Sequence, residues 1–185
     1  MIKKLLILFQ IKLLSILKKD ATGAKIKLYR IRGYKIGDKC RIFTELGGSE
    51  AYLVSIGDNV TISTNVTLLT HDNSIIKISH GNYTDLFGEI TIGNNCFIGA
   101  NATILPGVSL ADGTIVAAGS IVTKSTDKPN MIIGGNPAKI IGNASDYYNK
   151  NKNKAFNCAN LNKTKRKEII ENNRDKLIRK RVLTK

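Results

Sequence analysis

The residue with the clearest chemical potential is His71, in the stretch LLTHDN, because the 185-residue chain has only two histidines. A neutral imidazole with a pKa of about 6.5 can take a proton from a hydroxyl group, which is typically worth about 10²- to 10⁴-fold in rate. Such a base needs an acceptor on its second ring nitrogen, and Asp72 or Glu50 could supply it. Position alone favours a solvent-facing loop residue for His71, as we expect for His80.

A second group of residues combines small side chains with lysines further along the chain. Small residues let a ligand approach the backbone closely, and lysines offer positive charge to phosphates. Each residue alone is a weak signal, because small residues are normal in turns and single lysines are usually solvated. The group consists of Ala100, Ala117, Ala118, Gly119, Thr123, Lys124, Pro137, Ala138 and Lys139.

Both groups lie in or beside a repeat of six residues. From Ile92 the chain reads IGNNCF IGANAT ILPGVS LADGTI VAAGSI VTKSTD, and an earlier run starts at Ile56. A period of six fits the strand period of two and not the helical period of 3.6, so it predicts short strands joined by turns. Three hexads would close a coil of 18 residues, which places Ile92 over Leu110, Ile98 over Val116 and Ile104 over Val122.

The repeat is interrupted once, and His71 stands at the start of the interruption. Residues 70–89 do not follow the pattern, so we expect them to leave the coil as a protruding loop. After Asp127 the rhythm ends in KPNMIIGGNPAKIIG, where Pro129 and Pro137 prevent continued regular pairing. This segment predicts a terminal cap whose last strand returns along the coil.

These features together resemble the hexapeptide-repeat acyltransferases. The passage IGDNVTISTNVTLLTHD is similar to the sugar O-acetyltransferase branch, which includes the galactoside and maltose enzymes and those of capsule and O-antigen pathways. The resemblance implies an all-β solenoid, a left-handed parallel β-helix with a protruding loop and helical ends. It also implies a homotrimer with active sites between the subunits.

The resemblance further implies roles for the two groups of residues. His71 would be the general base, with Asp72 or Glu50 as its orienting partner, and the second group would contact coenzyme A. We therefore expect direct transfer of an acetyl group from acetyl-CoA to a sugar hydroxyl, with no metal. The acceptor would be a sugar or glycan in surface polysaccharide biosynthesis.

Charge separates the two ends of the chain from its middle. The net charges are +9 for residues 1–35, −3 for residues 36–142 and +9 for residues 143–185. The middle lacks the basic residues interleaved with aromatics that nucleic-acid binding needs, so we expect no nucleic-acid partner. We assign residues 1–34 to a basic helical segment, residues 35–142 to the repeat domain, and residues 143–185 to a basic linker and helix.

The N-terminal segment predicts an amphipathic helix with a basic face. Its apolar arc would pack on the core or a partner subunit, or lie on a membrane surface. The arc contains Ile2, Leu5, Leu6, Phe9, Leu13, Ile16 and Leu17, and the residues outside it are Lys3, Lys4, Gln10, Lys12, Lys18 and Lys19. We expect a cytoplasmic protein that can contact the inner face of the membrane.

Several alternatives remain at this level. An N-acetyltransferase for a nucleotide-linked amino sugar would share the fold, and a β-helical scaffold or glycan-binding module would need no catalysis. Serine acetyltransferases carry a long helical N-terminal domain, for which about 35 residues are too few. Two histidines cannot supply the three zinc ligands of a gamma-class carbonic anhydrase, and the three cysteines show no CxxC spacing.

Overall fold

The computed structural model describes residues 2–16 and 21–179. It divides into two compact units, Met1–Ala144 and Ser145–Lys185. The first unit contains the whole of the repeat, and the second contains most of the basic C-terminal segment. Each unit is described below by itself.

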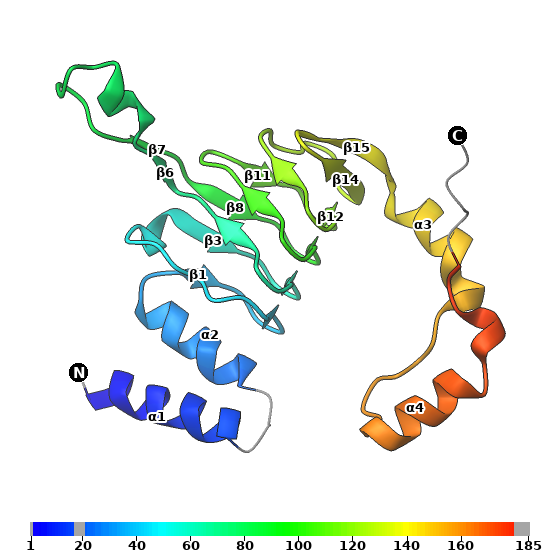
Figure 1. Cartoon of the computed structure of the whole chain (residues 1–185). Helices are drawn as coiled ribbons and strands as arrows, with labels where there is room; N and C mark the ends of the chain where they lie inside the picture. The colour runs from blue at the N-terminus through cyan, green and yellow to red at the C-terminus, as the bar shows by residue number, and fades with distance from the viewer. Residues whose placement is uncertain (1, 17–20, 180–185) are drawn as a thin grey trace. The chain divides into compact units, whose positions relative to one another are not determined.

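The first unit is built on three parallel sheets of very short strands (Figure 1). The first sheet contains β1 (Lys35–Ile36), β3 (Val54–Ile56), β8 (Ile90–Ile92) and β11 (Ser109–Leu110). The second contains the parallel strands β2 (Arg41–Ile42), β4 (Thr61–Ile62), β9 (Phe97–Ile98), β12 (Ile115–Val116) and β14 (Met131–Gly135), with the antiparallel β15 (Ala138–Asn143) at its edge. The third contains β5 (Thr67–Leu68), β10 (Thr103–Ile104) and β13 (Ile121–Val122).

From β8 to β13 the chain visits the three sheets in turn, and strands eighteen residues apart are paired. Ile92 pairs with Leu110, Ile98 with Val116 and Ile104 with Val122, which is the predicted register. The inward side chains stack into aliphatic ladders, and Ile62, Ile98 and Ile104 are completely buried. Parallel pairing therefore builds the hydrophobic core. Each Å² of apolar surface that is removed from water stabilises the fold by roughly 25 cal/mol.

The turns between strands are formed by residues that suit tight stacking. Asn59 and Asn95 have positive φ angles of 54° and 57°, and their side-chain amides form a hydrogen bond of 2.9 Å. Asparagine tolerates this left-handed conformation better than most residues. Gly99 allows two stacked turns to approach closely, because a Cβ there would lie 2.5 Å from the backbone nitrogen of Ala118.

The predicted loop is a two-stranded antiparallel arm with a short helical tip. It consists of β6 (His71–Asp72), the 3-10 helix η2 (Ser74–Lys77) and β7 (Leu86–Phe87), with His71 opposite Phe87. Figure 1 shows this arm leading away from the parallel sheets. His71 therefore lies at the point where the arm joins the repeat.

The ends of the first unit are covered by helices and by a hairpin. Helices α1 (Ile2–Ile16) and α2 (Thr22–Ile31) lie side by side before β1. At the other end, β15 (Ala138–Asn143) returns antiparallel to β14, and the Asn136–Pro137 peptide bond is cis. The returning strand agrees with the predicted cap.

The second unit contains more helix than the sequence suggested. Helix α3 (Ala144–Asn151) begins at the unit boundary, in the stretch predicted to be a linker, and the 3-10 helix η3 (Lys152–Lys154) follows it. Helix α4 (Lys163–Glu171) begins after Asn162, whose side chain accepts a hydrogen bond from the Lys165 backbone at 2.8 Å. It ends earlier than predicted and is followed by the 3-10 helix η4 (Arg174–Lys176). Residues 180–185, also predicted helical, lie outside the described residues.

Candidate active site

His71 is held by a carboxylate that the stacking of the chain brings next to it. Its Nδ1 lies 2.9 Å from Glu50 Oε2. The His71 side chain is 42% exposed, whereas that of Glu50 is only 12% exposed. The ring of Phe87, across the arm, lies 6.0 Å from the imidazole. One side of the imidazole is therefore fixed while the rest stays open to a ligand.

Glu50 is itself held by neighbouring hydroxyl groups. Ser49 Oγ donates to its Oε1, and Thr70 Oγ1 donates to its Oε2 at 2.9 Å. Hydrogen bonds from Ser49, His71 and Thr70 together lower the pKa of Glu50 from 4.5 to about 2. Glu50 is therefore an anion at neutral pH and can only accept hydrogen bonds.

This geometry fixes the tautomer that the neutral imidazole must adopt. Because Glu50 is an acceptor, His71 Nδ1 carries the hydrogen of the 2.9 Å contact. The lone pair of the neutral ring is then on Nε2, which can take a proton from an incoming group. The arrangement has the base and orienting acceptor that a general-base mechanism needs.

Asp72, the other predicted partner, has a different contact. Its Oδ1 accepts a hydrogen bond from the Ser74 backbone at 2.8 Å, and that bond lowers the pKa of the Asp72 carboxyl. Asp72 thus stabilises the start of the arm as a turn residue. The structure places Glu50, and not Asp72, on the imidazole.

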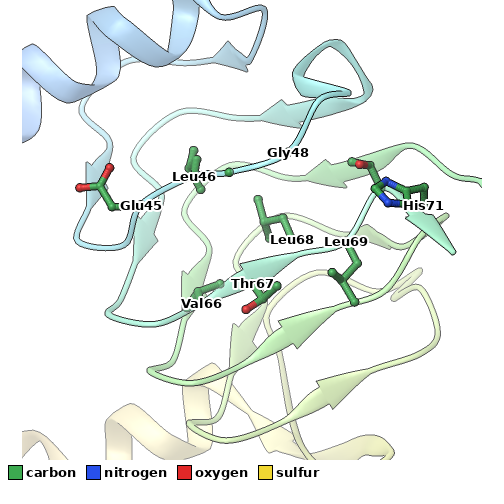
Figure 2. Close-up of a pocket in the computed structure, with 10 residues that line it drawn as sticks. Glu45, Leu46, Gly48, Val66, Thr67, Leu68, Leu69 and His71 are labelled. Atoms are coloured by element: carbon green, nitrogen blue, oxygen red, sulfur yellow. The ribbon is translucent and has the colours of Figure 1, made fainter. Parts of the chain in front are cut away.

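His71 borders a pocket of about 310 Å³ beside the repeat (Figure 2). Two segments line it, one before β3 and one that includes β5. The lining residues are Glu45, Leu46, Gly47, Gly48, Val66, Thr67, Leu68, Leu69, Thr70 and His71. Figure 2 shows Glu45 and His71 at opposite ends of the pocket. A ligand in this pocket can reach the imidazole.

The wall that contains Glu45 is tied to helix α2 by Tyr29, which is completely buried. The Tyr29 hydroxyl lies 3.2 Å from the Thr44 carbonyl oxygen and 3.0 Å from Glu45 Oε2. It also accepts a hydrogen bond of 3.3 Å from the Leu46 backbone N–H. Burial raises the pKa of Tyr29 to about 12, so the hydroxyl keeps its proton at neutral pH.

A second pocket, of about 290 Å³, contains five of the nine residues expected to contact a coenzyme. It lies between the segment after β13 and the β14–β15 hairpin, and both Lys124 and Lys139 are exposed. The five are Thr123, Lys124, Pro137, Ala138 and Lys139, and the other lining residues are Ser125, Thr126, Asp127, Met131, Ile133 and Ile140. Residues far apart in the sequence thus meet around one hollow.

The other four predicted residues lie outside that pocket, in stacked turns of the repeat. The Gly119 backbone N–H donates to the carbonyl oxygen of Ala100 at 2.8 Å. Ala118 and Gly119 are exposed, whereas Ala100 and Ala117 are half-buried. His71 does not line the second pocket either. A single chain therefore does not gather all the predicted residues in one hollow.

Sequence reasoning missed Ser49, Thr70 and Phe87. Ser49 and Thr70 immediately precede Glu50 and His71, so adjacency to the candidate pair was a usable signal. Phe87 is sixteen residues from His71 and meets it only because the arm folds back on itself. That pairing could not be read from the pattern of hexads.

Cys40, Cys96 and the possible metal-ligand residues offer no competing chemistry in the described part of the chain. Burial raises the pKa of the Cys96 and Cys40 thiols, which makes both poor nucleophiles at neutral pH. Among residues 2–16 and 21–179, no group of three or more His, Cys, Asp and Glu side chains is placed to hold a metal ion. His71 remains the group with a catalytic arrangement.

Comparison with known proteins relates this architecture to one family. The model for the hexapeptide repeat of succinyl-transferase matches residues 48–70 and 89–124, which flank the arm. Protein CapG of Staphylococcus aureus is 39% identical over 164 residues, and the match covers 86% of this chain and 92% of CapG. The chain belongs to the hexapeptide-repeat acyltransferases. This confirms the predicted family and enzyme class, and it sets aside the non-enzymatic scaffold.

Other relatives match a smaller part of their own length. Galactoside O-acetyltransferase of Escherichia coli is 41% identical over 95 residues, covering 51% of this chain and 46% of that enzyme. A hexapeptide-repeat-containing acetyltransferase from Vibrio cholerae shares 26% identity at a TM-score of 0.54, covering 60% and 63% of the two chains. A maltose O-acetyltransferase from Clostridium difficile, at 24% identity and a TM-score of 0.52, covers 67% and 76% and shows a similar fold.

Proposed function

We propose that this protein transfers an acetyl group from acetyl-CoA to a hydroxyl group of a sugar. The observation that carries the proposal is the His71–Glu50 pair beside a pocket, since it supplies an oriented base with a free Nε2. The similarity to sugar acetyltransferases supports the choice of donor and acceptor.

In the proposed reaction, Nε2 of His71 takes the proton of the acceptor hydroxyl while its oxygen forms a bond to the thioester carbonyl carbon. The carbon–sulfur bond then breaks, and the thiolate leaves as free coenzyme A after taking the proton from the imidazolium. Glu50 stabilises the imidazolium through the Nδ1–H hydrogen bond. No acyl-enzyme is formed, so the acetyl group moves in one transfer.

We place the coenzyme along the second pocket and the neighbouring turns. Lys124 and Lys139 would meet its phosphates, while the low turn at Ala117, Ala118 and Gly119 leaves room for its pantetheine arm. Ala100 lies on the same stack of turns, hydrogen-bonded to Gly119. The lysines are exposed and the turn carries no large side chain, which supports this placement.

We further propose that the three parallel sheets are the sides of a left-handed parallel β-helix, and that three copies assemble into a homotrimer. The eighteen-residue register and the fold of the relatives support the β-helix. The separation of His71 from the second pocket supports an active site shared between subunits, with the base from one copy and the coenzyme groove from another. The divisions 1–34, 35–142 and 143–185 and a cytoplasmic location stay predictions.

For the acceptor we propose a sugar within surface polysaccharide biosynthesis, such as capsule or O-antigen. The extensive similarity to CapG supports this choice, since it covers nearly the whole of both chains. The passage AYLVSIGDNVTISTNVTLLTHDNS supports it as well, through its resemblance to acetyltransferases of those pathways.

The test is an acetyl-transfer assay with a matched set of acceptors. Thiol release from acetyl-CoA would be followed with hydroxyl sugars, oligosaccharides and an amino sugar nucleotide, with the His71→Ala protein as a blank. We expect acceptor-dependent release with a hydroxyl acceptor and an ester product that alkali removes. Release only with the amino sugar nucleotide, giving an alkali-stable amide, would show N-acetylation instead.

A further inference from the structure

Helix α1 has two apolar faces, and only one of them is used for packing within the chain. Ile7 is buried at 8% exposure, and Ile11 and Leu14 are half-buried. Helix α1 lies along α2 (Figure 1), and Lys3 and Ile7 line a hollow together with Lys27, Arg30 and Ile31. Packing on α2 therefore accounts for one stripe of apolar residues and not for the other.

The second stripe lies on the opposite side of α1 and faces solvent. At 100° per residue its members fall within an arc of about 100° that is centred opposite Ile7. The exposed fractions are 74% for Ile2, 68% for Leu5, 64% for Leu6, 67% for Phe9 and 44% for Leu13. We call these five residues the outer stripe. The side chain of Ile16, and all of Leu17, Lys18 and Lys19, lie outside the described residues.

The helix that carries the outer stripe is basic, and acidic residues are almost absent from this part of the chain. At 100° per residue Lys12 falls next to the arc, beside Leu5, whereas Lys3 and Lys4 fall outside it, toward the side of α2. In the sequence, residues 1–35 contain ten basic side chains and a single acidic one, Asp20. An apolar stripe on a basic segment matches a surface that combines hydrocarbon with negative charge.

We propose that the outer stripe of α1 docks this protein onto an anionic lipid bilayer, with the helix lying in the membrane interface. The fifteen residues of α1 would extend about 22 Å, less than the roughly 30 Å of a hydrocarbon core. Among the described residues no helix is both long and apolar enough to cross a membrane. Docking would bring the pocket at His71 close to acceptors that are attached to lipid.

Charge favours a lipid surface over a second copy of the chain as the occupant. Two copies joined through the outer stripe would bring together two segments of net charge +9 each. Like charges at such an interface repel, whereas each Lys or Arg near an anionic leaflet contributes about 1 kcal/mol of attraction. The same positive charge that opposes self-association therefore favours the membrane.

The first experiment is vesicle flotation with the full chain. We expect binding to vesicles of phosphatidylcholine mixed with phosphatidylglycerol, little binding to phosphatidylcholine alone, and weaker binding as salt is raised. Failure to bind the mixed vesicles at low salt would overturn the proposal. Equal binding to both kinds of vesicle would overturn it as well, because charge would then have no part in docking.

Variants within α1 test the stripe itself. Leu6→Gln with Phe9→Gln should lower the partition coefficient at least about tenfold, because two apolar side chains lose their place in the interface. Leu8→Gln is the matched control, since Leu8 lies on the same helix outside the stripe and is less exposed, at 42%. Glutamine and leucine have similar helix propensities, so the helix itself should persist. Equal loss in both proteins would contradict the proposal.

A charge variant and a mass measurement complete the test. Lys12→Gln should lower partitioning roughly fivefold, the equivalent of about 1 kcal/mol for the lysine beside the stripe. Thiol release with a free sugar acceptor should stay at the wild-type rate in every variant, which separates docking from catalysis. A change in oligomeric mass on altering the outer stripe, without any effect on vesicle binding, would show that a second copy covers it and would overturn the proposal.

Discussion

The two pockets of the repeat unit differ in how completely one chain builds them. At the first, two hydroxyl groups hold Glu50 and a third hydrogen bond joins Glu50 to His71, so the polar groups are already in position. At the second, Lys124 and Lys139 are exposed, and the salt bridges found among the described residues involve neither of them. The proposed base is thus preorganised within one chain, whereas the proposed coenzyme groove presents free charge to an incoming anion.

Removing the imidazole of His71 should cause the largest loss of activity. His71→Ala should lower kcat/KM by about 10²- to 10⁴-fold, because the acceptor hydroxyl loses its base. The measurement is steady-state thiol release at saturating acetyl-CoA. His80→Ala is the matched control, since it removes the other histidine from an exposed position in the arm and should leave the rate unchanged. A rate within a few-fold of wild type for His71→Ala would remove the first pocket from the mechanism.

The next effect should come from the partner of the base. Glu50→Gln keeps the shape of the side chain but removes the anion, so kcat should fall by about 10²-fold while the KM for acetyl-CoA changes little. Asp72→Asn is the control, because Asp72 contacts the Ser74 backbone and not the imidazole. Equal losses in the two variants would show that Glu50 has no special role.

Substitutions in the second pocket should weaken the binding of acetyl-CoA and leave the chemical step nearly unchanged. Lys124→Ala and Lys139→Ala should each raise the KM for acetyl-CoA about tenfold with kcat nearly unchanged, because each removes one charge-assisted contact to a phosphate. Lys128→Ala is the matched control, since Lys128 is an exposed lysine of the same region that does not line the pocket. A fall in kcat at constant KM would contradict the assigned role.

The smallest effect is a dependence of stability on pH. The folded-state pKa of Glu50 is about 2, below its usual 4.5, so its contribution to stability is full above about pH 4.5 and is lost as the pH falls through about 2. Thermal unfolding of wild type and Glu50→Gln should therefore show a Tm difference at pH 6 that shrinks below about pH 4.5. A difference that is constant down to about pH 2 would mean that the charge of Glu50 does not stabilise the fold.

The repeat was predictable because each hexad carries its own signal. Ile92, Ile98 and Ile104 recur at a strand-compatible period, and one eighteen-residue step fixes the partner of each. Helix α3 was not predicted, because its short sequence, ASDYYNKN, shows no apolar stripe of helical spacing and none of its residues is buried. Local pattern therefore predicted the core well and the polar C-terminal unit poorly.

The site was predictable only in part, for a geometric reason. His71 stands out in the sequence, but choosing between Glu50 and Asp72 required knowledge of how residues 43–53 fold. This segment, between β2 and β3, is irregular, since it contains no strand of the third sheet. Glu50 is therefore 21 residues from His71 and not at a multiple of six. Only the folded chain shows that the irregular passage places Glu50 against the imidazole.

The central claim is that Glu50 holds His71 with its lone pair on Nε2, and nitrogen-15 NMR of the two imidazoles tests it most directly. The signals can be assigned with His80→Ala, because the chain contains only two histidines. The account predicts that neutral His71 carries its hydrogen on Nδ1, and that Glu50→Gln shifts this balance. A neutral His71 with its hydrogen on Nε2 would contradict the account, since that nitrogen could not accept a proton from the acceptor.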